Sequence, residues 1–153
     1  MQMSFLNKIK SAIDSGRGEL ATQVSRFKNR KFMEGTVAVC VRIAMASDGA
    51  SAEEKQKMMA FITSSPELNV FDTDEVIAFF NSVCGKYDFD MDIGKGEAMK
   101  YIVRLKDQQD AAQLAVRVGI AIGKSDGDFD EAEREATREI CIALGLSPAE
   151  FNL

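Results

Sequence analysis

Residues 124–136, KSDGDFDEAEREA, hold the set of side chains best suited to chemistry in this chain. Its first five acidic residues are Asp126, Asp128, Asp130, Glu131 and Glu133. Carboxylates at alternate loop positions, with one more from the following helix, supply the hard oxygen ligands that Ca²⁺ and Mg²⁺ prefer. A preceding helix would add the negative end of its dipole. The run is therefore a candidate site for a divalent metal ion.

A related junction occurs earlier in the chain. Ser-Asp-Gly stands at 47–49 and again at 125–127, an offset of 78 residues, and an acidic start to a new helix follows each copy. The runs before the junctions are apolar nearly all round, which is typical of a helix at the centre of a bundle. The repeat predicts two similar helical hairpins that pack around one core.

Helix capping explains both junctions without a metal. Glycine can adopt the left-handed conformation that ends a helix. Ser51 or Asp130 can then accept a hydrogen bond from the first N–H groups of the next helix, and Glu54 or Glu133 completes a capping box. Capping needs only one short polar residue and one glutamate, whereas the second junction has more acids, whose repulsion a cation would relieve. Both interpretations stay open.

Neither junction follows the EF-hand pattern, which needs glycine at the sixth loop position and glutamate at the twelfth. Counted from Asp126, these positions hold Glu131 and Thr137. The first junction offers fewer ligands, Asp48 and the two glutamates at 53 and 54. Any ion would be bound weakly, because no rigid ligand cage is evident.

A third acidic run, YDFDMDIGKGE at 87–97, alternates Asp88, Asp90 and Asp92 with apolar residues. This alternation predicts an extended link with one face on the core and the other in water. The EF-hand pattern fails here too. If the link folds beside either junction, its carboxylates could join a shared acidic cluster.

Histidine is absent from the chain, which removes the commonest general base and the commonest zinc ligand. Cys40, Cys84 and Cys141 are far apart and form no C-x-x-C pair. Each lies in an apolar run, so we expect small buried residues in a reducing compartment, with a reactive thiol as the lesser alternative.

Charge is unevenly distributed along the chain. Residues 1–31 carry seven Lys or Arg and two acids, net +5, which leaves −10 for residues 32–153. We expect a basic amphipathic N-terminal helical arm at 1–31 that meets a partner or an anionic membrane, or docks with its charged face in water. The cluster RFKNRK suits nucleic acid poorly, because it has one aromatic residue and precedes an acidic body.

Helical spacing dominates the 153 residues, so the fold class expected is all-α, in one compact domain. Expected helices span 32–47, 72–85, 94–106 and 110–124, with others starting at 51 and 130 and a last turn after Pro148. No apolar run approaches the roughly 20 residues that span a bilayer, and no leader-like segment is evident, so we expect a cytoplasmic protein.

These features together resemble the tellurite-resistance TerB family. The resemblance rests on SFLNKIKSAIDSGRGEL, NRKFMEGTVAVCVRIAMASDGASAEEKQKM, the stretch 87–102, and AQLAVRVGIAIGKSDGDFDEAERE, in this order. It implies about seven helices in two similar halves, which places a TerB-like domain at 32–153. It also implies a divalent-metal site at Asp48, Glu54, Asp126 and Glu133; spacing adds Asp128 and Asp130.

The resemblance further implies a non-enzymatic role in tellurite resistance and stress response. The partners implied are other tellurite-resistance proteins, including an integral membrane protein, at the inner face of the membrane. We expect Ca²⁺ as the bound ion. The alternatives are a thiol-dependent enzyme that detoxifies tellurite and a structural helical adaptor without metal.

Overall fold

The computed structural model describes residues 18–46, 52–125 and 129–153. Within these ranges the chain forms seven α-helices and two short 3₁₀ turns, and none of these residues lies in a strand. The α-helices are α2 (Gly18–Ser25), α3 (Arg30–Ala44), α4 (Ala52–Ser64), α5 (Thr73–Phe89), α6 (Met91–Val103), α7 (Gln109–Ser125) and α8 (Glu131–Leu144). The expected all-α fold is confirmed.

Capping residues set several of the helix ends. The Asn29 side chain accepts a hydrogen bond of 2.8 Å from the Phe32 N–H and so starts α3. Gly145, at φ 74°, ends α8 in the left-handed conformation. Pro148 begins the final 3₁₀ turn, Pro148–Phe151, as predicted, because proline suits the first helical position.

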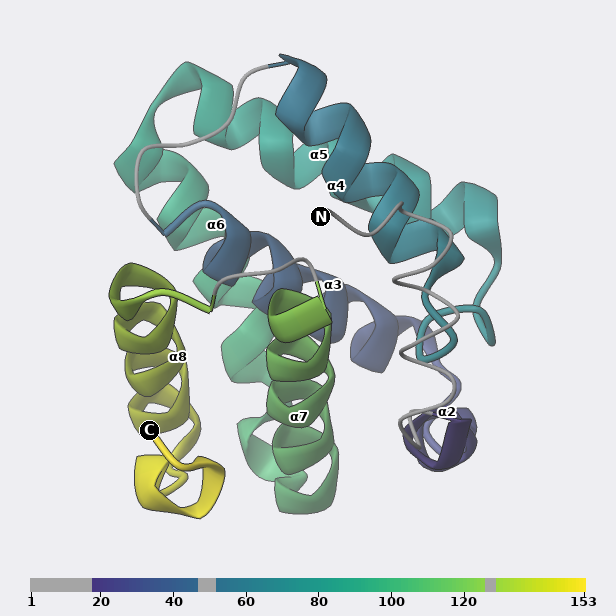
Figure 1. The fold of residues 1–153 in the computed structure, drawn as a ribbon, viewed down its shortest axis with the longest axis vertical. Helices are drawn as coiled ribbons and strands as arrows, with labels where there is room; N and C mark the ends of the chain where they lie inside the picture. Colours follow the sequence, from purple (N-terminus) through teal and green to yellow (C-terminus); the bar gives the residue numbers. More distant parts are fainter. Residues whose placement is uncertain (1–17, 47–51, 126–128) are drawn as a thin grey trace, which may run out of the picture.

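Helix α3 runs through the centre of the molecule and packs most extensively against α6 and α7 (Figure 1). All its residues from Val37 to Ile43 are buried, which confirms the central position predicted from its apolar character. Two glycines permit the close approach of its neighbours. A Cβ on Gly119 of α7 would lie 2.5 Å from Val39, and one on Gly35 would lie 2.7 Å from Leu105.

The outer helices cover this core from two directions. Helices α4 and α5 pack against each other across one end of the molecule, whereas α7 and α8 lie side by side at the other (Figure 1). Helix α8 also contacts α3 and α6, so it closes one side of the central helix. The similarity of the two halves stays a prediction.

The segment around the third acidic run differs from the prediction. Helix α5 continues to Phe89 and α6 begins at Met91, so a sharp helical corner replaces the expected extended link. Asp90 makes the corner because it ends α5 and caps α6. The apolar side chains do not lie on the core: Phe89 is 79% exposed, and Met91 and Ile93 are also exposed.

The described part of the basic segment docks on the core. Val24 of α2 is fully buried and α2 contacts α7, while Arg26 and Lys28 are exposed. The first part of the predicted amphipathic arm, residues 1–17, lies outside the described residues. The boundary between an arm at 1–31 and a domain at 32–153 stays a prediction. None of the helices in the described residues combines the length and apolar content needed to cross a bilayer.

Candidate functional site

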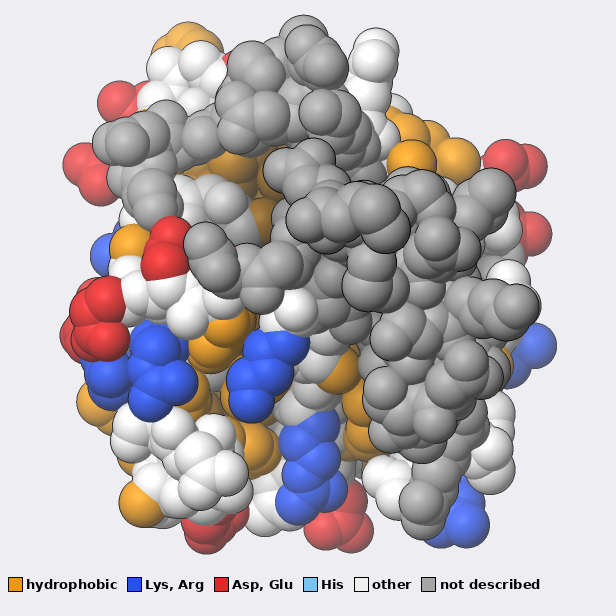
Figure 2. Space-filling view, in the orientation of Figure 1, with side chains coloured by type: hydrophobic (Ala, Val, Ile, Leu, Met, Phe, Trp, Pro, Cys, Tyr) orange, Lys and Arg blue, Asp and Glu red, His pale blue; other side chains and the backbone are white. Residues whose placement is uncertain are grey.

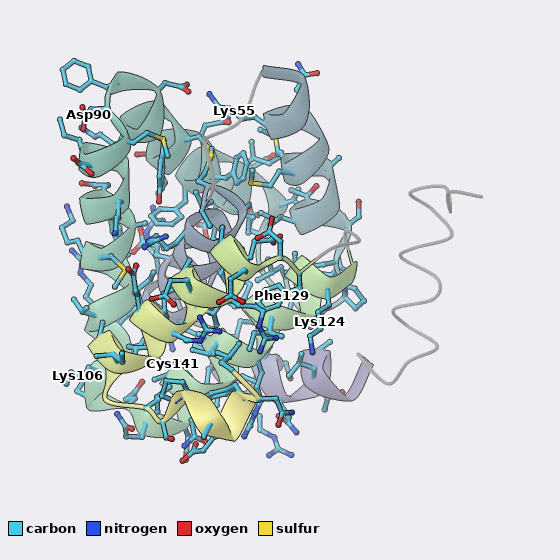
Figure 3. The ribbon with its side chains drawn as sticks, turned by 60° about the vertical axis from the view of Figure 1, so that its left-hand side comes forward. Lys55, Asp90, Lys106, Lys124, Phe129 and Cys141 are labelled. Carbon is cyan, nitrogen blue, oxygen red and sulfur yellow. The ribbon has the colours of Figure 1, made fainter. Side chains whose placement is uncertain are left out.

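At the second junction, packing and capping together fix where α8 begins. Phe129 folds back on the end of α7, where a Cβ on Gly123 would lie 3.0 Å from its ring (Figure 3). Asp130 Oδ1 accepts a hydrogen bond of 2.8 Å from the Glu133 N–H, and Glu133 Oε1 accepts one of 3.2 Å from the Asp130 N–H. The predicted capping box is therefore present.

The glutamates that follow are paired with arginines of the same helix. Arg138 lies 2.9 Å from Glu131 and 2.6 Å from Glu135, and Arg134 lies 3.8 Å from Glu131. Figure 2 shows acidic and basic side chains next to each other over α8. The sequence suggested that the carboxylates at this junction repel one another without compensation. This is wrong for Glu131, because Arg134 and Arg138 of the same helix are close enough to pair with it.

Four of the six predicted metal ligands are not described. Asp48, Asp126 and Asp128 lie outside the described residues, and Glu54 lies in α4 with its side chain undescribed. Asp130 and Glu133 are the two that are described. No three acidic or cysteine side chains in the described ranges gather closely enough to hold a metal ion.

The aspartates of the third acidic run stabilise the corner between α5 and α6. Asp90 Oδ1 accepts hydrogen bonds from the N–H groups of Asp92 at 2.9 Å and Ile93 at 3.1 Å. Asp88 forms an ion pair with Lys55 of α4. In Figure 3 Asp90 lies apart from Phe129, whereas Asp92 of the same run lines a cleft that also borders α8.

A cleft of about 340 Å³ opens between the end of α3, the α5–α6 corner and the first turns of α8. Its lining residues are Arg42, Met45, Ala46, Tyr87, Met91, Asp92, Lys95, Ala132, Glu135, Ala136 and Glu139. Ala46 is the last described residue before the first junction, and Ala132 lies in the first turn after the second. The described ends next to the two junctions therefore border the same cleft.

A charged network crosses this cleft. The Arg42 side chain, 7% exposed, donates from Nη2 to Glu139 Oε2, and Lys95 Nζ lies 3.5 Å from the same oxygen. Sequence reasoning missed these residues. Arginine inside VAVCVRIA was the available signal, because a charge on a helix that is buried all round needs a partner.

Tyr87 lies in the cleft wall with its ring against α6. A Cβ on Gly94 would lie 2.3 Å from the Tyr87 ring, so glycine is what lets the two helices meet here. Burial raises the pKa of Tyr87 to about 12, although the nearby Arg42 charge opposes this. Its hydroxyl therefore stays protonated at neutral pH.

All three cysteines are buried, as predicted. Burial raises the pKa of Cys84 and of Cys141 to about 11. A thiol with a raised pKa and little access to solvent is a poor nucleophile at neutral pH, because the thiolate is the reactive form.

Comparison with known proteins identifies the family. The family model described as tellurite resistance protein TerB matches residues 33–153. The chain belongs to the tellurite-resistance TerB family. A tellurium resistance protein TerB from Alcaligenes sp is 67% identical over 120 residues, which cover 78% of this chain and 98% of that protein. No solved structure matches the chain.

The cleft and both junctions lie in the part of the chain that the TerB model matches, whereas the basic segment 1–31 precedes it. Membership in the TerB family confirms the resemblance seen in the sequence.

Proposed function

We propose that this chain is a non-enzymatic tellurite-resistance protein that binds one divalent cation, Ca²⁺, at its two acidic helix junctions. The proposed ligands are Asp48, Glu54, Asp126, Asp128, Asp130 and Glu133. Membership in the TerB family supports the resistance role. The ion would relieve the mutual repulsion of carboxylates gathered at the junctions.

The observation that carries a shared metal site is the position of Ala46 and Ala132 on one cleft. Each is close in sequence to one of the junctions, so we expect carboxylates from both junctions to reach one region. The capping box is compatible with an ion, because it uses one oxygen of the Asp130 carboxylate and a carboxylate has two.

Calorimetric titration with Ca²⁺, Mg²⁺ and Mn²⁺ tests the metal site. We expect the wild type to release or absorb heat on binding Ca²⁺ and the variant with Asp126→Asn and Asp128→Asn to lose it. A matched control, Asp74→Asn with Asp110→Asn, makes the same change in net charge at two exposed aspartates outside the junctions. Equal heats in the wild type and the junction variant would exclude the proposed site.

A thiol-dependent enzyme is the less favoured alternative, because Cys40, Cys84 and Cys141 are all buried. Reduction of tellurite by a thiol needs an accessible thiolate. Rapid modification of the native protein by a thiol reagent, at the rate of the unfolded chain, would favour this enzyme over the metal-binding module.

We further propose that the protein is cytoplasmic and acts at the inner membrane surface with other tellurite-resistance proteins, including an integral membrane protein. The exposed Arg26 and Lys28 support contact with anionic lipid, each worth about 1 kcal/mol. Co-sedimentation with vesicles rich in phosphatidylglycerol should decrease when both become glutamate. The same binding in the variant would argue against this contact.

A further inference from the structure

Two residues that line the cleft between α3, α6 and α8 each carry a buried hydrogen-bond donor without an acceptor. Among the described residues, neither Arg42 Nε nor the Tyr87 hydroxyl has a hydrogen-bond partner, and both residues line the cleft. An unsatisfied buried donor destabilises the folded protein, and it does so more strongly when it is charged. Two such donors at one cleft indicate that acceptor atoms belong there.

The carboxylate of Glu139 fills only part of this need. Its Oε2 serves both Arg42 Nη2 and Lys95 Nζ, so one oxygen is shared by two cations. The Glu139 side chain is 43% exposed and can turn towards water, whereas Arg42 is held in the protein interior. An isolated guanidinium there would be costly, so a departing carboxylate requires another anion in its place.

We propose that this cleft binds a small inorganic oxyanion, with Arg42, Lys95 and Tyr87 as its donors and with the Glu139 carboxylate displaced. Such an ion carries three or four oxygens, enough to reach the two unsatisfied donors as well as the two cations. The cleft has a volume of about 340 Å³. A water molecule takes up roughly 30 Å³ in the liquid, so the cleft has space for the ion and several waters. None of these three donors is a proposed metal ligand, so the two proposals can be tested separately.

The other charges that face the cleft set how tightly the ion binds. Glu135 is already paired with Arg138 at 2.6 Å, so its charge is partly neutralised. Asp92 is exposed at the rim and repels an anion. Binding should therefore be weak in the wild type, and it should strengthen when a competing carboxylate is removed.

The experiment titrates the full chain with sulfate, phosphate and tellurite in the presence of a chelator, following two-dimensional NMR spectra. We expect saturable shifts at Arg42, Tyr87 and Lys95 for at least one of the three ions. Tyr87→Phe keeps the ring against Gly94 and should weaken binding about tenfold or more, since a hydrogen bond to a charged group is lost. Tyr101→Phe, which removes the other tyrosine hydroxyl, should bind as the wild type does.

Glu139→Gln should strengthen binding of the oxyanion, whereas Tyr87→Phe should weaken it. It removes the competing carboxylate and should tighten binding about tenfold. Because this variant also leaves Arg42 unpaired, its melting temperature is measured with and without the ion, and the ion should raise it more than in the wild type. The proposal is overturned if neither the wild type nor Glu139→Gln shows saturable shifts with any of the three ions. It is also overturned if Tyr87→Phe and Tyr101→Phe bind the ion equally well, or if binding requires a metal.

Discussion

At the scale of single residues, Gly94 shows how closely α5 and α6 approach. The Tyr87 ring occupies the space where a side chain at position 94 would begin, and the distance of 2.3 Å to a Cβ is far too short. The glycine thereby sets where Tyr87 lies in the cleft. Gly96, two residues further on, has open space around it.

We therefore predict that Gly94→Ala lowers the free energy of unfolding by about 1–3 kcal/mol, because overpacking forces Tyr87 or the helices to shift. Gly96→Ala is the matched control and should raise it by about 0.5–1 kcal/mol, because alanine is the better helix former. Urea denaturation measures both. Equal effects of the two substitutions would contradict the close contact.

Because the protein's thiols are buried, we expect the free energy of unfolding to fall as the pH becomes alkaline. Burial raises the pKa of Cys84 and Cys141 from 9.0 to about 11, so the unfolded chain loses these protons at lower pH than the folded protein does. Their contribution is complete below pH 9 and is lost as pH rises towards 11. We predict that the free energy of unfolding falls between pH 8 and pH 10.5.

This loss should be smaller in a variant with Cys84→Ala and Cys141→Ala, because two titrating groups are gone. Urea unfolding at both pH values measures the difference, and Cys40→Ala is a single-cysteine control. The same loss in the double variant and in the wild type would show that the thiols do not cause it.

At the scale of elements, aspartates from two of the acidic runs act as helix caps. Asp90 joins α5 to α6 and Asp130 starts α8, each by accepting hydrogen bonds from backbone N–H groups. The charge of Asp130 and its capping role can be separated, because asparagine caps a helix about as well as aspartate does.

Asp130→Ala should lower the free energy of unfolding by about 1 kcal/mol, through loss of the cap. Asp130→Asn should change it by only a few tenths, yet it should weaken Ca²⁺ binding if Asp130 is a ligand. Thermal unfolding and calorimetric titration of the two variants give the two readouts. If Asp130→Asn binds Ca²⁺ as the wild type does, Asp130 is only a cap.

At the scale of the whole molecule, packing of α8 against α3 and α6 brings together segments that are distant in sequence. Arg42 and Glu139 are 97 positions apart and form an ion pair, and Ala46 and Ala132 border one cleft. The arrangement of these helices decides whether the two junctions can share the proposed ion.

We predict one Ca²⁺ per chain. Asp48→Asn at the first junction and Asp126→Asn at the second should each weaken the same binding event, because their ligands would share one ion. Calorimetric stoichiometry measures this. Two ions per chain, with each substitution abolishing one of them, would contradict a shared site while leaving metal binding itself intact.

Helix positions, burial of the cysteines and the capping box at Asp130 were predictable from sequence, because they depend on periodicity and on residues only a few positions apart. The corner at Asp90 was predicted wrongly. Alternating polar and apolar residues there suggest an extended link. The same sequence pattern is also compatible with two helices joined by one aspartate, which ends the first helix and caps the second. The local pattern did not distinguish an extended link from a helical corner. The prediction assumed that the apolar residues would be buried, whereas they are exposed.

By itself, the sequence determined an all-α fold, a central apolar helix and the TerB resemblance, since these reside in spacing along the chain. Only the tertiary structure decided which charges meet. The contacts of Glu139 with Arg42 and Lys95, and the place of Tyr87 in the same cleft, depend on how helices cross. Electrostatic and hydrogen-bond energies depend on distance in space, and helix packing alone sets that distance.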